Sequence, residues 1–260
     1  MSGTPPTFLS RILSILTAAQ CAGLVLYVSR DSSAVGSVLF VHLEAGEAWS
    51  VGVDRTAAQL ALAIAVTAVA GWPNRGLLFV SGWFALLALA QTYDGGVPFA
   101  MLSLPAHATR IALPIAALLA ARLESGRSHG LDPEGWRWGV RIAIALTFAT
   151  HGYEALAGHP RFIDYILTAD EKLFSAFPEQ PDALRLMLVI GILDLGVACL
   201  ILTGRDTRWL LAYAACWGVL TAIARVVHVE QRYPQALIRV ANGGLPLVLL
   251  FSRSGFAAAG

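Results

Sequence analysis

The sequence predicts an all-α membrane protein with eight transmembrane helices, arranged as two tandem four-helix bundles of the same topology. The 260-residue chain is 57% hydrophobic and only 13% charged, whereas soluble domains carry about 25% charged residues. Apolar runs close to the ~20 residues that cross a bilayer recur along the whole chain. The two halves of the chain also match each other in sequence, which predicts a duplicated fold.

Eight apolar runs are the candidate spans. The fourth is the shortest and contains Pro114, which neighbouring helices can accommodate inside a membrane. Two further segments, 33–46 and 164–177, are too short in apolar sequence to span, and we expect them to lie on the outer membrane face as amphipathic segments. The candidate spans are 9–28, 57–72, 76–91, 111–121, 140–157, 184–203, 209–227 and 236–251.

The internal repeat has a lag of about 130 residues, and its three matching stretches keep their order. Each half then holds an even number of spans, so the halves have the same rather than inverted topology. We therefore divide the chain into a first repeat, 1–122, a polar cytoplasmic connector, 123–139, and a second repeat, 140–260. The matching stretches are RILSILTAAQC from Arg11 with RIAIALTFATH from Arg141, WFALLALAQ from Trp83 with WGVLTAIAR from Trp217, and RIALP from Arg110 with RVANG from Arg239.

The placement of arginine predicts the orientation. Short basic turns are retained in the cytoplasm, so the side that holds them, together with both termini, is predicted to be cytoplasmic. Those turns contain Arg75, Arg122, Arg127, Arg137, Arg205 and Arg208. The opposite, outer side is acidic, with Glu44, Glu47, Asp54, Asp94, Asp164, Asp170, Glu171, Glu179, Asp182 and Glu230. With a net charge of +1 and a single lysine, the chain is not expected to bind nucleic acid.

Polar side chains cluster at the outer ends of the second-half spans. An ionisable residue at membrane depth is costly, about 2.5–3.5 kcal/mol on insertion scales, and so predicts a function and a partner. Three pairs share a helix face through i, i+3 spacing, and one aspartate lies deep in the sixth span. The candidate ligand-binding or proton-relay residues are His151, Glu154, Asp194, Arg225, His228, Arg239 and Asn242; no catalytic residue or metal ligand is assigned.

We expect Glu154 or Asp194 to pair with Arg225 or Arg239, since an unpaired charge there would cost more than a paired one. A structural ion pair without a ligand, or arginines that reach toward lipid headgroups, would explain the same charges. The first half conserves little of the set, with only Arg110 matching, and is expected to be mainly scaffold. Its other equivalents are Cys21, Leu24, Gln91, Asp94 and Leu113. We expect His42 and His107 at the surface.

The second half resembles the DoxX-like family of four-span bacterial membrane proteins. The stretches RIAIALTFATHGYEALAGHPRFIDYI, IGILDLGVACLILTGRDTRW and AACWGVLTAIARVV carry the resemblance, and the matching positions are Arg141, Gly152, Asp194, Gly204 and Arg208. The resemblance implies a multi-pass protein of the bacterial inner membrane. It also implies a redox-associated subunit, linked to quinone reduction in some members.

The leading hypothesis is a redox-linked membrane subunit with a quinone- or lipid-like ligand near the outer face of the second bundle. His151 or His228 would donate a hydrogen bond or carry a proton, Glu154 would relay it, and Arg225 would hold the ligand. No electron carrier is visible in the sequence, so a redox partner protein would supply it. A transporter of small molecules or lipids, and a structural accessory subunit of a larger membrane complex, are the alternatives. Whether the chain catalyses a reaction stays open.

Overall fold

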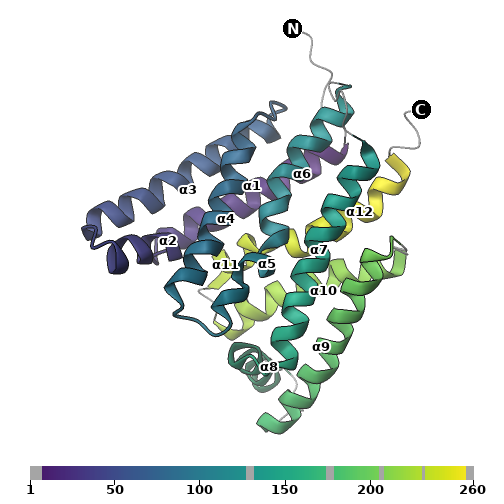
Figure 1. Ribbon diagram of the computed structural model, residues 1–260. Helices are drawn as coiled ribbons and strands as arrows, with labels where there is room; N and C mark the ends of the chain where they lie inside the picture. The colour runs from purple at the N-terminus through teal and green to yellow at the C-terminus, as the bar shows by residue number, and fades with distance from the viewer. Residues whose placement is uncertain (1–7, 127–131, 174–178, 205–207, 230–231, 256–260) are drawn as a thin grey trace.

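A computed structural model describes residues 8–126, 132–173, 179–204, 208–229 and 232–255, with side chains to residue 252 (Figure 1). Over these ranges the chain is helical and contains no strand. Four long helices belong to the first half: α1 (Phe8–Val28), α3 (Glu47–Val69), α4 (Gly76–Asp94) and α6 (Ala108–Glu124). Four belong to the second: α7 (Pro133–Leu156), α9 (Gln180–Leu202), α10 (Arg208–His228) and α12 (Val240–Gly255).

Short helices connect the long ones at the end of the molecule away from the termini. In the first half they are α2 (Ala34–Ser37), the π-helix η1 (Val38–His42), the 3₁₀-helix η2 (Ala100–Leu102) and α5 (Ser103–Ala106). In the second half they are α8 (Pro160–Leu173) and α11 (Tyr233–Ile238). The start of α1 and the end of α12, the first and last described helix ends, lie at the opposite end of the molecule (Figure 1). The predicted residues Arg127, Arg205 and Glu230, and the end of the segment 164–177, lie outside the described residues.

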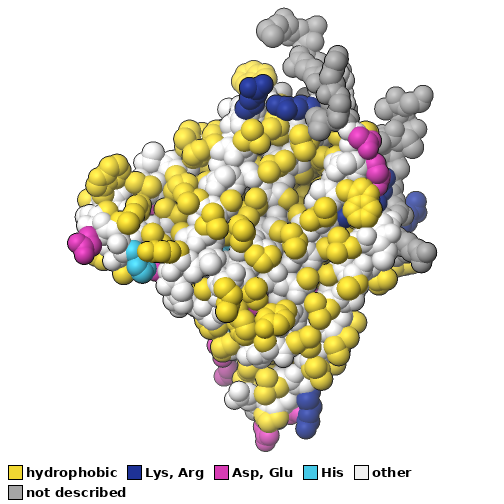
Figure 2. Space-filling view, in the orientation of Figure 1, with side chains coloured by type: hydrophobic (Ala, Val, Ile, Leu, Met, Phe, Trp, Pro, Cys, Tyr) yellow, Lys and Arg dark blue, Asp and Glu magenta, His cyan; other side chains and the backbone are white. Residues whose placement is uncertain are grey.

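Among the described residues, seven helical stretches are long and apolar enough to cross a membrane. They include α1, α3, α4, α9 and α10, together with Ala100–Glu124 and Tyr233–Ser252. Hydrophobic side chains cover the middle of the face seen in Figure 2, and charged side chains gather toward its ends. The chain is therefore a multi-pass membrane protein. The expected fifth span, α7, is not among the seven, because Arg141, His151 and Glu154 lower its hydropathy; the eighth span stays a prediction.

The two halves make corresponding helix contacts. Helix α1 packs on α3 and α6 as α7 packs on α9 and α12, and α4 packs on α6 as α10 packs on α12. Across the halves, α1 contacts α11 and α12, while α7 contacts α5 and α6. The first and last long helices of each half therefore meet in the centre. Their apolar side chains form the largest core cluster, which includes Leu13, Leu113, Ile144, Phe148 and Leu245.

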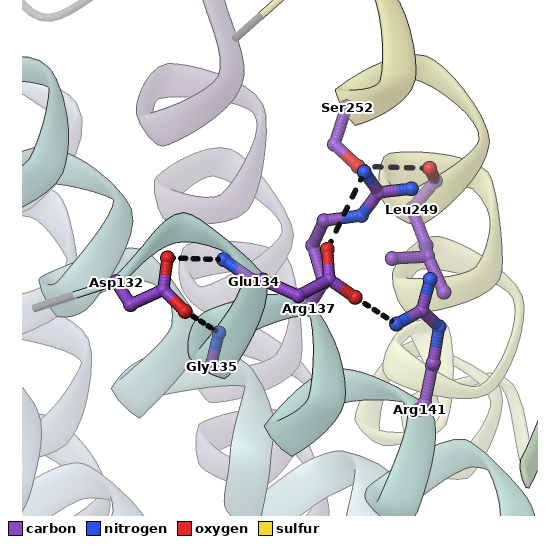
Figure 3. A network of polar contacts seen from close by, with 7 residues as sticks. All are labelled: Asp132, Glu134, Gly135, Arg137, Arg141, Leu249 and Ser252. Atoms are coloured by element: carbon purple, nitrogen blue, oxygen red, sulfur yellow. Dashed lines mark hydrogen bonds and ion pairs between the residues drawn. The ribbon is translucent and has the colours of Figure 1, made fainter. Parts of the chain in front are cut away.

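A charged network secures the end of the molecule that carries the termini (Figure 3). Helix α7 begins there with Asp132 as N-cap, whose carboxylate accepts from the backbone N–H groups of Glu134 and Gly135. The Glu134 carboxylate accepts from Arg141 at 2.7 Å and lies 3.8 Å from Arg137. The guanidinium of Arg141 also lies 5.0 Å from the centre of the Trp138 ring. Arg141, one of the positions in the family resemblance, thus has a structural role at this end.

Candidate functional site

A cavity of about 400 Å³ lies between the two halves, at the end of the molecule away from the termini. Its walls come from the C-terminal ends of α1, α4, α7 and α10, from the start of α6, and from the short helices that join them. Helix breaks place two of the walls: α6 begins after His107, and Arg239 separates α11 from α12. The expected single run 236–251 is therefore two helices, and its break lies at the cavity.

Positive charge dominates the cavity. Five arginines line it: Arg110, Arg161, Arg225, Arg232 and Arg239. The carboxylates of the lining are Glu154 and Asp94, and Asp94 is already 3.2 Å from the Nε2 of His42. Arg161 is exposed, whereas Arg110 and Arg225 are 5% and 8% exposed. The buried part of the cavity thus holds several guanidinium groups against one carboxylate, Glu154.

The guanidinium groups of the cavity keep free donors. Arg225 donates to the carbonyl oxygen of Thr221 at 2.8 Å, and Arg239 donates to that of Gln235 at 3.0 Å. The Nε atoms of Arg110, Arg225 and Arg239 are buried, and none has a hydrogen-bond partner among the described residues. Unpaired donors of a charged group are costly to bury. A negatively charged group in the cavity would offset the charge of these guanidinium groups.

The expected ion pair between the acids and the arginines of the second half is wrong for the described residues. Glu154 contacts His151 instead, with 3.1 Å between Oε2 and Nδ1. The arginine groups that would have paired with Glu154 bond to backbone carbonyls of their own helices. Glu154 still lies in the electrostatic field of the arginines, so it partly offsets their charge without neutralising any one of them.

A chain of hydrogen bonds crosses the interface of the halves next to the start of α6. The hydroxyl of Thr147 on α7 donates to Thr109 on α6 at 3.3 Å, and Thr109 donates to the Oδ1 of Asn242 on α12 at 2.8 Å. On α1, Gln20 donates to the carbonyl oxygen of Arg110 at 3.0 Å. These contacts fix the start of α6, and with it Arg110. Asn242 is therefore not in the cavity lining but joins α12 to the start of α6.

Aromatic side chains line one side of the cavity. The ring of His159, in the turn before α8, stacks on Phe162 at 4.6 Å and on Phe99 of the first half at 5.2 Å. Burial, and next the positive charge of Arg161, lower the pKa of His159. The folded chain therefore favours the neutral form of this ring. Tyr165 on α8 lies under Arg225, with 5.2 Å from its ring centre to the guanidinium carbon.

Of the seven candidate residues, four line the cavity: His151, Glu154, Arg225 and Arg239. His228 lies behind the wall, where its Nδ1 is 2.9 Å from the hydroxyl of Thr168 and ties α10 to α8. Asp194 is 4% exposed in the middle of α9, its Oδ1 has no hydrogen-bond partner among the described residues, and it is not part of the cavity lining. His228 and Asn242 therefore position helices.

Sequence reasoning missed the contribution of the first half. Arg110 and His107 line the cavity, and His107 is half-buried there rather than at the surface. The signal was present in the repeat, because Arg110 aligns with Arg239. The half expected to be mainly scaffold thus supplies one of the buried arginines.

Comparison with models of known families, with curated proteins and with solved structures gave no match to this chain. Within the described ranges, no group of three or more His, Cys, Asp or Glu side chains is placed to hold a metal ion. We therefore infer the chemistry of the cavity from the residues that line it.

Proposed function

We propose that this chain is a multi-pass membrane protein that binds an anionic, amphiphilic ligand in the cavity between its two repeats. The observation that carries the proposal is that Arg110, Arg225 and Arg239 line the cavity around a single buried carboxylate, Glu154, and that none of them forms an ion pair among the described residues. Arginine is the residue best suited to bind carboxylate and phosphate groups through paired hydrogen bonds.

The rest of the lining supports an amphiphile. Apolar side chains on the helices that enter the membrane, among them Leu24, Phe84, Leu87 and Ile238, share the cavity with the arginines. A volume of about 400 Å³ lies within the ~300–1,000 Å³ of small-molecule sites. A headgroup would lie against the arginines, and its apolar part would lie along these side chains.

In the same proposal, α7 also crosses the membrane, which brings the number of spans to eight. The chain then forms two four-helix repeats of the same topology. The corresponding contacts of the halves and the position of both termini at one end support this arrangement. The neighbours α6, α9 and α12 cover the polar side chains of α7, as polar residues of a membrane helix require. With the termini in the cytoplasm of a bacterial inner-membrane protein, the cavity lies on the outer side.

The redox role implied by the DoxX-like resemblance would use the same cavity. A quinone is neutral and provides no negative charge for three guanidinium groups, so we favour a lipid-like anion over a quinone. Transport is the second candidate, favoured by the position of the cavity between two repeats. Uptake of a labelled anionic lipid into liposomes that contain the protein would distinguish transport from binding alone.

Ligand-dependent thermal unfolding in a neutral detergent tests the proposal. We expect dihexanoyl phosphatidylglycerol to raise the melting temperature and dihexanoyl phosphatidylcholine, which has no net charge, to leave it unchanged. A ligand at 100 times its Kd stabilises by about 2.7 kcal/mol. Arg239→Gln should lose the effect, whereas Arg185→Gln, an exposed arginine paired with Asp182 outside the cavity, should keep it. Equal stabilisation by both lipids would refute an anion site.

A further inference from the structure

The balance of charge in the buried part of the cavity is uneven. Arg110, Arg225 and Arg239 bring three positive charges and Glu154 one negative charge, which leaves two positive charges with the histidines neutral. Arg239 is half-buried, but its Nε is buried without a partner, as are those of Arg110 and Arg225. Of the other charged lining residues, Arg161 is exposed, and Arg232 and Asp94 are half-buried, so we leave them outside this set. A ligand with two negative charges would therefore neutralise the buried set.

We propose that the headgroup bound here is a dianion, and specifically a phosphate monoester. The inference rests on the proposed function and names its ligand class. A phosphate monoester carries close to two negative charges above its second pKa of about 6 and presents three acceptor oxygens. A phosphate diester, such as the headgroup of phosphatidylglycerol, carries one charge and leaves one buried guanidinium without a counter-charge.

The three arginines come from different parts of the chain and line one cavity. Arg110 lies on α6 of the first repeat, Arg225 on α10, and Arg239 at the break before α12. Each lies in the electrostatic field of at least one of the others, so each raises the affinity of the site for an anion. Guanidinium groups without a carboxylate partner are suited to bind the oxygens of a phosphate monoester.

Glu154 limits the charge of the site. It is 7% exposed and bonded to His151, so it is a fixed part of the lining. Without it the cavity would hold three uncompensated positive charges, and with one arginine fewer it would hold one. The preference between dianion and monoanion should therefore follow the number of charges that the lining carries.

The experiment compares dihexanoyl phosphatidic acid with dihexanoyl phosphatidylglycerol at pH 8, by titration calorimetry on the full chain in neutral detergent. We expect phosphatidic acid to bind at least tenfold more tightly. Arg225→Gln should reduce this ratio to about one, Glu154→Gln should keep or increase it, and Arg185→Gln should leave it unchanged. If Arg225→Gln does not fold, Arg239→Gln gives the same test.

Equal affinity of the two lipids for the wild-type chain would overturn the dianion while the anion site stands. Binding of neither lipid would overturn the proposed function itself. Inorganic phosphate, added as a competitor, distinguishes a free phosphate ester from a lipid headgroup as the source of the dianion. Competition with phosphatidic acid at equal concentration would indicate a free phosphate ester, and competition only at a large excess would indicate a lipid headgroup; both outcomes support the dianion.

Discussion

Two buried arginines of this chain should respond in opposite directions to the same substitution. Arg110 and Arg141 are 5% and 3% exposed. Arg141 has a carboxylate partner, Glu134, at 2.7 Å and an aromatic face, Trp138, at 5.0 Å. Arg110 forms no ion pair among the described residues and lies in the electrostatic field of Arg225. Methionine has a similar length and no charge, so it removes the guanidinium group and keeps most of the apolar contact.

The magnitudes follow from these contacts. Loss of a charged hydrogen bond costs about 1.5–3 kcal/mol, and loss of a cation–π contact costs about 0.5–1 kcal/mol. We therefore expect Arg141→Met to lower the free energy of unfolding by roughly 2–4 kcal/mol. Replacing a poorly compensated buried charge by an apolar group is often stabilising by about 1–4 kcal/mol. We expect Arg110→Met to stabilise the ligand-free chain by the lower part of that range.

Thermal unfolding of lipid-stripped protein in neutral detergent measures both changes. Each kcal/mol shifts the melting temperature by roughly 2–4 °C for a chain of this size. Arg110→Met should melt higher than the wild type yet no longer respond to anionic lipid, and Arg141→Met should melt lower and still respond. If Arg110→Met melts as low as Arg141→Met, Arg110 is a structural residue and the reasoning is refuted.

Three further experiments test the fold around the cavity. Gly218→Ala would place its Cβ 2.5 Å from the carbonyl carbon of Asn242 and should cost about 1–3 kcal/mol of stability, whereas Gly196→Ala, with nothing within 4 Å, should be neutral or stabilising in the same melting experiment. Asn242→Leu should cost about 0.6–1.7 kcal/mol, the range of interhelical hydrogen bonds in membranes; a double-mutant cycle with Thr109→Val that shows no coupling would contradict the bond. His159 has a lowered pKa in the folded chain, so unfolding takes up a proton as the pH falls through the unfolded value of about 6.5, and stability is lost there. Between pH 7.5 and 5, the melting temperature of His159→Phe should therefore fall less than that of the wild type. An equal fall would show that His159 does not contribute to the pH dependence of stability.

The apolar runs predicted the long helices well, because a membrane span must be both long and apolar. The described boundaries of α1, α4, α9 and α10 lie within a few residues of the predicted ones. The start of α3 was missed by ten residues, since Glu47 and Asp54 interrupt the apolar pattern. Asp54, expected on the outer surface, is 2% exposed and accepts from the backbone N–H of Ser33 at 2.8 Å. Hydropathy does not distinguish a buried carboxylate that has a nearby hydrogen-bond partner from an exposed one.

The site was predicted in part. Polar residues at span ends identified His151, Glu154, Arg225 and Arg239, because membrane depth makes such residues costly without a purpose. The direction in which a helix face points depends on how the helix is rotated relative to its neighbours. The spacing of residues along a single helix does not determine this rotation. His228 has the same i, i+3 spacing from Arg225 as Glu154 from His151, yet it faces α8.

Native mass spectrometry of the chain released from its membrane tests the central claim most directly. The cavity should retain one small anionic, lipid-like molecule per chain in the wild type, and the variant with Arg110→Gln and Arg239→Gln should lose it while it remains folded and helical. An identical bound mass on both proteins, or no bound anion on a folded wild type, would contradict an anion site between the repeats.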